Sequence, residues 1–179
     1  MLYKNPKEKV KLAEKFSKHA HLGKFRKVDG KPFHTHPEDV VKILKKYGYD
    51  HPLTICIAYL HDTVEDTDLA LDEIRENFGH ETAHGVFMLS RNKGKVMGKE
   101  KLTREEYKQR LAFARNKVQR IKIADMIDNT KDLINLPEYY VKRKIEDSEK
   151  FYIPLGKEIA PEMTKELILN IESYRNKKN

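Results

Sequence analysis

Residues 61–68 read His-Asp-Thr-Val-Glu-Asp-Thr-Asp and directly follow the apolar segment Ile55–Leu60. The run places one imidazole and four carboxylates within eight residues. If the segment is helical, His61 and Glu65 lie one turn apart and share a face. Like charges this close are unfavourable unless a cation offsets them, and an adjacent His and Asp offer one nitrogen and one oxygen ligand. The run therefore predicts a divalent metal site.

A purely structural interpretation of the same run is an acidic helix end. In that interpretation Asp66 or Asp68 caps the next element and His61 is hydrogen-bonded in the core. This explanation suffices for an isolated His-Asp pair. Two further segments of the chain favour the metal site, because they supply the other ligands that a coordination shell needs.

The upstream segment is residues 26–37, Arg-Lys-Val-Asp-Gly-Lys-Pro-Phe-His-Thr-His-Pro. Its glycine and first proline mark a turn, and Pro37 suits the start of a helix. We therefore expect His36 to lie where this helix begins. His34 is a second candidate, and spacing alone does not separate the two histidines.

The downstream segment is residues 121–129, Ile-Lys-Ile-Ala-Asp-Met-Ile-Asp-Asn. Lys122, Asp125 and Asn129 recur at intervals of three and four residues, so they form one polar stripe on a largely apolar helix. A buried polar stripe needs partners, which again indicates a site.

Together the segments resemble the HD-domain metal-dependent phosphohydrolases, and within them the Rel/SpoT alarmone hydrolase domain and the small metazoan SpoT homologues. That pattern is Arg-Lys near a Gly-x-Pro-aromatic-x-x-His-Pro turn, then His-Asp-x-x-Glu-Asp-Thr, then Lys-x-Ala-Asp-x-x-x-Asn. It is present here in order and at matching separations from Arg26 to about Leu133, with a looser echo at Pro154-Leu155. The single pieces are weak signals, and the ordered set is specific.

The resemblance implies that His36, His61, Asp62 and Asp125 bind one divalent ion, typically Mn²⁺ in this group. Two imidazoles and two carboxylates suit a first-row metal and leave positions for water and a substrate oxygen, although zinc also fits. The matched ligand stands immediately before proline, so His34 is expected beside the site or on the surface.

The resemblance also implies roles for four charged residues and one amide. Glu65 and Asp66 would orient and deprotonate the attacking water or return a proton to the leaving group, with the two roles left open. Arg26 and Lys27 would stack on a purine or bind its edge or a phosphate. Asn129 would form a hydrogen bond with the ribose or the base of the nucleotide. Solvated surface charge is the alternative for both charged pairs.

One position departs from the family pattern and one segment has two interpretations. Asp132 stands where many Rel/SpoT members have a hydroxyl side chain, which leaves the sugar and phosphate contacts open. Residues 91–101 carry two glycines and five basic side chains. They form either a solvated loop or a lid that closes on substrate phosphates. Lys99 and Lys101, with Arg143 on a later helix, are the candidate phosphate contacts.

Composition sets the limits of the molecule. The 179 residues and 21.1 kDa predict a single domain over residues 1–179, a stand-alone hydrolase without the synthetase domain of bifunctional Rel/SpoT enzymes. The net charge of +8 favours anionic partners such as phosphates. No aromatic-interleaved basic stripe, helix-turn-helix signal or zinc-finger spacing supports specific nucleic-acid recognition.

The location is inferred from what the sequence lacks. The single cysteine, Cys56, allows no internal disulfide, and no apolar leader or stretch of about 20 apolar residues is found. We therefore expect a cytoplasmic protein with no membrane partner. The sequence does not determine the oligomeric state.

Helical periodicity dominates the chain and predicts an all-α HD-type bundle. A short helix is closed by Gly79, and the long helical region that follows is either continuous or broken near Asn116. We expect helices over residues 10–20, 37–47, 52–60, 71–78, 81–90 and 107–128, and final helices that open at Pro137 and Pro154.

The predicted function is Mn²⁺-dependent hydrolysis of guanosine 3′-diphosphate 5′-di- or triphosphate, with release of the 3′ pyrophosphate. Its nearest alternative is an HD phosphatase for another nucleotide, such as the 2′-phosphate of NADPH or a nucleoside monophosphate. A second alternative is a nucleotide-binding protein that keeps the metal without turnover. The intact Glu65-Asp66 pair favours catalysis over that last class.

Overall fold

The computed structural model describes residues 5–26, 29–91 and 101–178. Over these ranges the chain is helical and contains no β-strand, and an isolated antiparallel bridge joins Phe25 to Pro32. The all-α prediction is confirmed. The α-helices are α1 (Pro6–Ala20), α2 (Thr35–Lys46), α3 (Pro52–Leu60), α4 (Thr63–Asp66), α5 (Leu71–Phe78), α6 (His80–Leu89), α7 (Arg104–Ala112), α8 (Asn116–Thr130), α9 (Glu138–Asp147), α10 (Ile153–Ile159) and α11 (Pro161–Lys178).

Helix α3 lies at the centre of the N-terminal half. Pro52 occupies its first turn, and the His51 side chain accepts a hydrogen bond from the Leu53 amide at 3.3 Å, so the start is well defined. Every residue from Thr54 to Leu60 is buried, because α1, α2, α6 and α8 all pack against this helix. A helix that is apolar on all sides is stable only in such a position.

The approach of α6 to α3 depends on a glycine. A Cβ atom at Gly85 would lie 2.5 Å from Cδ1 of Ile57, closer than atoms can pack. The glycine therefore allows α6 and α3 to come close together at Ile57, one turn before His61.

Helix α8 is the second central helix and packs on α2, α3, α10 and α11. Its buried residues include the apolar Ile121, Ile123 and Ile127 and also two acids, Asp125 and Asp128. Buried carboxylates require charged or hydrogen-bonding partners. In α8 those partners come both from the helix itself and from elsewhere in the chain.

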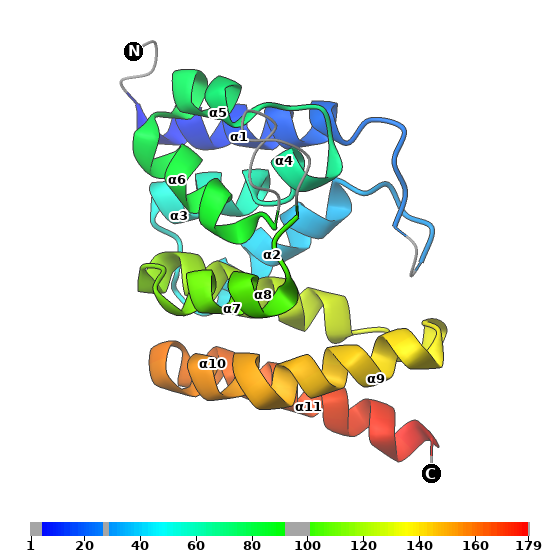
Figure 1. Cartoon of the computed structure of the whole chain (residues 1–179). Coiled ribbons are helices and arrows are strands. Elements are labelled where there is room, and N and C mark those ends of the chain that lie inside the picture. Colours follow the sequence, from blue (N-terminus) through cyan, green and yellow to red (C-terminus); the bar gives the residue numbers. More distant parts are fainter. Residues whose placement is uncertain (1–4, 27–28, 92–100, 179) are drawn as a thin grey trace.

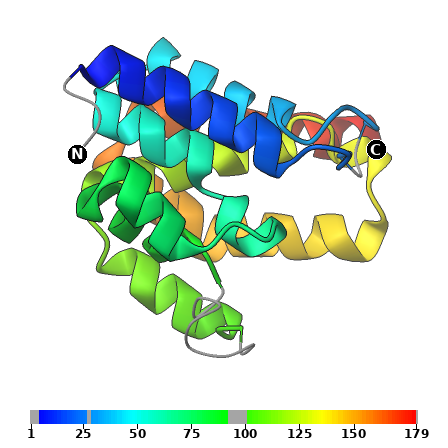
Figure 2. The ribbon, with the colours of Figure 1, turned by 90° about the horizontal axis from the view of Figure 1, so that it is seen from above.

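The helices lie in layers, with α1 and α5 at one end of the molecule, α2 and α3 further in, α7 and α8 next, and α9, α10 and α11 at the other end (Figure 1). Viewed from above, α1 runs across α3, with which it is in contact (Figure 2). No helix in the described part of the chain has the length and apolar character needed to span a membrane.

Most predicted helix boundaries agree with the structure. The expected break near Asn116 separates α7 from α8. Pro154 lies in the first turn of α10, as expected, and a π-helix (Ser148–Tyr152) joins the end of α9 to the start of α10. Because proline lacks an N–H, it is tolerated in the first turn after such an irregular segment. One further helix, α11, begins at Pro161.

Candidate functional site

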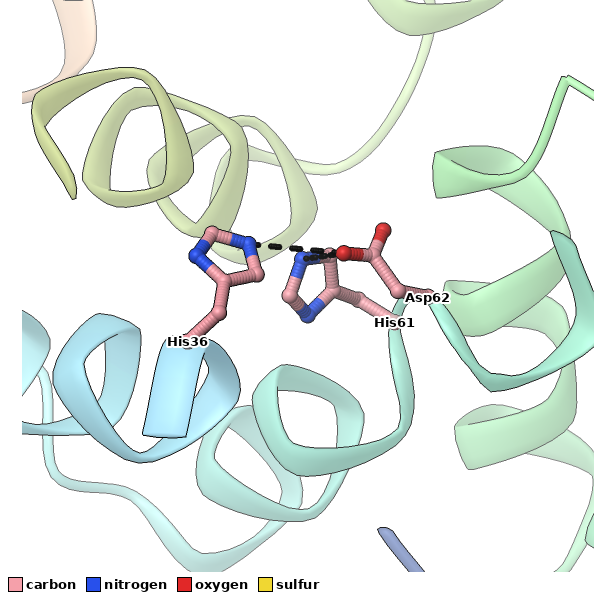
Figure 3. Close-up of side chains that lie close together, drawn as sticks. All are labelled: His36, His61 and Asp62. Atoms are coloured by element: carbon pink, nitrogen blue, oxygen red, sulfur yellow. Dashed lines mark ion pairs between the residues drawn. The ribbon is translucent and has the colours of Figure 1, made fainter. Parts of the chain in front are cut away.

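Three side chains converge where α2 begins and α3 ends: His36, His61 and Asp62 (Figure 3). One potential ligand atom from each lies within 4.8 Å of those of the other two. Nε2 of His61 is 3.1 Å from Oδ2 of Asp62, and Nε2 of His36 is 3.4 Å from the same oxygen. Both imidazoles are buried.

Asp125 approaches this cluster from α8. Its Oδ1 lies 3.0 Å from Nε2 of His36 and 3.8 Å from Nε2 of His61. The structure thus brings together the four predicted ligands from three separate parts of the chain. That they hold a metal stays a prediction. His34 lies outside the cluster, with Nε2 4.0 Å from a carboxylate oxygen of Glu38.

The donor set fits a divalent cation. Nδ1 of His61 donates to the Ala58 carbonyl at 2.7 Å, which orients the ring, while its buried Nε2 lies 3.1 Å from Oδ2 of Asp62 without the geometry of a hydrogen bond and has no hydrogen-bond partner within the described ranges. A buried polar nitrogen without a partner is costly, and metal-binding histidines are commonly oriented through their other nitrogen. Two nitrogens and two carboxylates suit a first-row metal, so this group could bind a divalent ion.

The charges of the site lead to the same conclusion. Burial opposes charge on His61, but the carboxylates of Asp62 and Asp125 overcome it and raise its pKa to about 9. His36 shows the same balance, and its pKa is raised well above the ordinary value by Asp125, Asp128 and Asp62. The carboxylates therefore attract protons in the absence of another cation. A divalent ion would displace those protons.

Asp128 is a site residue that the sequence analysis missed. Nδ1 of His36 donates to its Oδ2 at 2.6 Å, and Nη2 of Arg26 donates to the same oxygen at 2.8 Å. A carboxylate that accepts the second proton of a metal-binding histidine fixes the ring and increases its basicity. The signal available in the sequence was its position three residues after Asp125, on the same helix face.

A cavity lies beside the cluster and is lined by His36, Asp62 and Asp125. Arg26 borders this cavity but is already ion-paired. Its guanidinium lies 2.8 Å from Asp128, 3.7 Å from Asp39 and 3.8 Å from Asp29, and its side chain is only 11% exposed. The structure therefore shows a role for Arg26 in holding Asp128. Its predicted contact with a nucleotide remains a prediction. Lys27 lies outside the described residues.

The polar stripe of α8 is paired within itself. Nζ of Lys122 lies 2.6 Å from Oδ2 of Asp125, and the side-chain amide of Asn129 donates to Oδ1. Both oxygens of Asp125 are thus held from the same helix face. The predicted contact of Asn129 with a sugar or base stays a prediction, although Asn129 lines the cavity.

Glu65 and Asp66 lie on the short helix α4 and line the same cavity, whose volume is about 400 Å³. Oε2 of Glu65 accepts a hydrogen bond from the Arg91 amide at 2.9 Å. Partial burial and the nearby charges of Asp62 and Glu65 raise the pKa of Asp66 to about 6. The next helix is capped at Ala70, so Asp66 does not serve as that cap.

Lys144 on α9 is a second residue that the sequence analysis missed. It lines the cavity over the ring of Tyr140, with Nζ 5.2 Å from the ring centre. Burial lowers its pKa to about 8 against the attraction of Asp125. The residue named from the sequence was its neighbour Arg143, which lies in an adjoining recess.

The remaining predicted phosphate contacts are not placed at the cavity. Lys101 is exposed and does not line it. Lys99 and nearly all of the predicted lid lie outside the described residues.

The domain is helical and brings together two histidines and two aspartates that follow one another along the chain in the order His, His, Asp, Asp. This combination is the basis on which the protein is assigned to a class. Residues 12–158 match the family described as the HD domain, and the chain belongs to that family. The resemblance drawn from the motifs is thereby confirmed.

Several curated relatives are similar over most of this chain. A guanosine-3′,5′-bis(diphosphate) 3′-pyrophosphohydrolase from Aquifex aeolicus is 34% identical over 155 residues, covering 86% of this chain and 22% of the relative. A GTP pyrophosphokinase from Myxococcus xanthus is 32% identical over 157 residues, covering 84% of this chain and 20% of the relative. The chain therefore spans about a fifth of the length of these proteins.

A solved structure shares the fold over the full length. It is described as a metazoan ortholog of SpoT that hydrolyzes ppGpp, and it superposes with a TM-score of 0.68 at 22% sequence identity. The match covers 100% of this chain and 99% of that one.

Proposed function

We propose that the protein is a metal-dependent hydrolase of guanosine 3′-diphosphate 5′-di- or triphosphate. Water attacks the phosphorus attached to the 3′ oxygen, the bond between that phosphorus and the 3′ oxygen breaks, and pyrophosphate leaves. The 3′ oxygen takes up a proton, and GDP or GTP is the other product.

The observation that carries the proposal is the convergence of six side chains at one cavity. His36, Asp62 and Asp125 line it together with Glu65 and Asp66, and buried His61 lies directly behind. The similarity to curated enzymes named as 3′-pyrophosphohydrolases of this nucleotide supports the choice of reaction.

His36, His61, Asp62 and Asp125 would hold one divalent ion, and we propose Mn²⁺. When bound, such an ion polarises a phosphoryl oxygen and lowers the pKa of a water molecule. Asp128 keeps the ring of His36 in place, and Lys122 with Asn129 keeps the carboxylate of Asp125 in place.

Glu65 and Asp66 would manage the protons. Glu65 is positioned by the Arg91 amide, and the raised pKa of Asp66, about 6, allows this carboxyl group to gain and lose a proton near neutral pH. Lys144 presents a cation to the same cavity and is suited to a phosphate oxygen.

An activity screen tests the proposal. The purified protein with Mn²⁺ is incubated with guanosine tetraphosphate, NADPH and nucleoside monophosphates, and released pyrophosphate and phosphate are measured separately. Pyrophosphate from the first substrate is the expected result. Phosphate release from NADPH or a monophosphate alone would assign the site to another nucleotide, and no release with metal bound would indicate a binding protein.

A further inference from the structure

The short helix α4 carries both proposed catalytic acids, Glu65 and Asp66, in its second half. Its first half is anchored by burial, because Thr63 and Val64 are almost inaccessible to solvent. Neither acid is fully buried. A helix of four residues is far below the length of about 12–15 residues that a helix needs to be even marginally stable by itself. The positions of the two carboxylates therefore depend on contacts from outside α4.

Lys24 holds the end of α4 from the segment that precedes α2. Its ammonium group donates a hydrogen bond to the backbone carbonyl of Asp66, 42 residues away in the chain. The backbone of Lys24 is itself fixed, since its amide donates to the His21 carbonyl at 3.1 Å and its carbonyl accepts from the Phe33 amide at 2.8 Å. A cation at the last carbonyl of a helix satisfies a group that has no partner within the helix.

Arg91 holds the other acid through its backbone, and its side chain helps to fix that backbone. The amide of Arg91 donates to Oε2 of Glu65 at 2.9 Å, just beyond the end of α6. The guanidinium of Arg91 donates to the Leu102 carbonyl at 3.0 Å, and the Leu102 amide donates to the Arg91 carbonyl at 2.8 Å. Because these two bonds restrict the backbone at Arg91, the direction of its amide toward Glu65 depends on its side chain.

Lys24 and Arg91 differ in their access to a substrate. Lys24 does not line the main cavity and instead lines a separate groove of about 740 Å³, together with Thr67 and Leu69. A substrate in the main cavity would therefore be affected by Lys24 only through α4. Arg91 lines the main cavity, so direct contact with the substrate is the competing explanation for that residue.

We propose that Lys24 and Arg91 are positioning residues for the hydrolysis, which act through Asp66 and Glu65 and not on the metal or the substrate. Lys24 fixes the end of α4 that carries Asp66, and Arg91 fixes the carboxylate of Glu65. The inference rests on the proposed function, because that function requires the two acids to transfer protons at defined positions.

Kinetics on single variants give the first test, with Mn²⁺ and the nucleotide that the purified protein hydrolyses. Lys24→Met should lower kcat several-fold and Arg91→Met about tenfold or more, because a displaced proton-transfer group works poorly. KM and metal content should stay near wild type. Lys24→Arg should restore kcat, since a guanidinium can donate to the same carbonyl. Lys15→Met is the matched control, because Lys15 is an exposed lysine of the same groove and, within the described ranges, has no hydrogen bond to α4.

Double variants show whether each residue acts through its acid. A glutamine at position 65 transfers no proton, so Arg91→Met should cause little further loss of kcat when Glu65→Gln is already present. Lys24→Met should likewise cause little further loss in Asp66→Asn. Losses that multiply in the double variants would overturn the proposal. A rise in KM with kcat unchanged would also overturn it, because the residue would then act on the substrate.

Hydrogen exchange tests the same contacts without turnover. The amides of Asp66 and Thr67 donate to carbonyls one turn earlier, at 2.9 and 3.0 Å. These amides should exchange about tenfold faster in Lys24→Met, because local opening is easier once the helix end loses its anchor. The amide at position 91 should exchange faster in Arg91→Met, and Lys15→Met should match the wild type. Mass spectrometry of peptides that span these positions measures the rates.

The two kinds of measurement separate this inference from the proposed function. Wild-type protein that hydrolyses no nucleotide, with faster exchange in the variants, would refute the proposed function and retain the anchoring of α4. Active wild-type protein whose variants keep both kcat and exchange rates would refute the positioning role alone. Faster exchange with unchanged kcat would refute it too, because Lys24 and Arg91 would then stabilise α4 without serving the reaction.

Discussion

Asp128 accepts a hydrogen bond from Nδ1 of His36 at 2.6 Å, although 92 residues separate them in the chain. The contact joins the start of α2 to α8 and directs Nε2 of His36 toward Asp62 and Asp125. The carboxylate is almost completely buried and is also held by Arg26. The pair therefore determines how the predicted metal ligands face one another.

Replacement of Asp128 should weaken metal binding without removing a ligand. Asp128→Asn keeps the size of the side chain but loses the charge that increases the basicity of His36, so affinity for Mn²⁺ should fall about 10–100-fold. Calorimetric titration of the metal-free protein measures the change. Asp132→Asn is the control, since Asp132 is exposed on the neighbouring turn. Equal affinities in the two variants would show that Asp128 has no part in metal binding.

Loss of Asp125 should abolish metal binding and activity. In Asp125→Ala one of four predicted ligands disappears, and Lys122 is left as an uncompensated cation beside the two histidines. The metal content of the purified variant, measured by elemental analysis, should fall to background, and His61→Ala should behave alike. A full equivalent of metal in either variant would contradict the assignment.

Glu65→Gln should separate catalysis from metal binding. The glutamine can still accept the hydrogen bond from the Arg91 amide but cannot exchange a proton, so kcat should fall about 10²-fold or more while metal content is unchanged. Steady-state kinetics and elemental analysis on the same preparation distinguish a catalytic role of Glu65 from a role as metal ligand or as surface charge. Loss of metal would make Glu65 a ligand, and full activity would return it to surface charge.

Lys144 should impose an alkaline limit on substrate binding. Its pKa is lowered to about 8, so the ammonium is charged below that pH and neutral above it. The kcat/KM should therefore decline as pH rises through about 8, because an attraction for phosphate is lost.

A matched pair of variants checks that assignment. In Lys144→Arg the guanidinium stays charged, so the alkaline decline should move to higher pH or disappear. Lys142→Arg, at an exposed neighbouring position, should keep the wild-type profile. A decline that persists unchanged in Lys144→Arg would assign it to another group.

Much of the helical architecture follows from local chemistry that can be read in the sequence. Pro52 before an apolar run, Gly79 after Phe78, and the expected break near Asn116 each mark a helix boundary, and the observed boundaries lie close to these points. Pro154 likewise lies in the first turn of a helix, α10, which a π-helix joins to α9.

The identities of the central site residues were also available from the sequence. His36, the His61-Asp62 pair and Asp125 are separated along the chain in a spacing typical of the HD family, and the stripe of Lys122, Asp125 and Asn129 follows from helical periodicity alone. Contacts within one helix turn depend only on that periodicity.

The contacts between helices, by contrast, cannot be read from the sequence. Asp128 meets His36, Arg26 is held by carboxylates from elsewhere in the chain, and Lys144 lines the cavity while Arg143 lies in the recess beside it. Periodicity tells which side chains share a face of a helix, but the packing of whole helices decides what that face meets. The helical class and the candidate ligands can therefore be predicted from the sequence, whereas the packing of the helices decides how those ligands are supported.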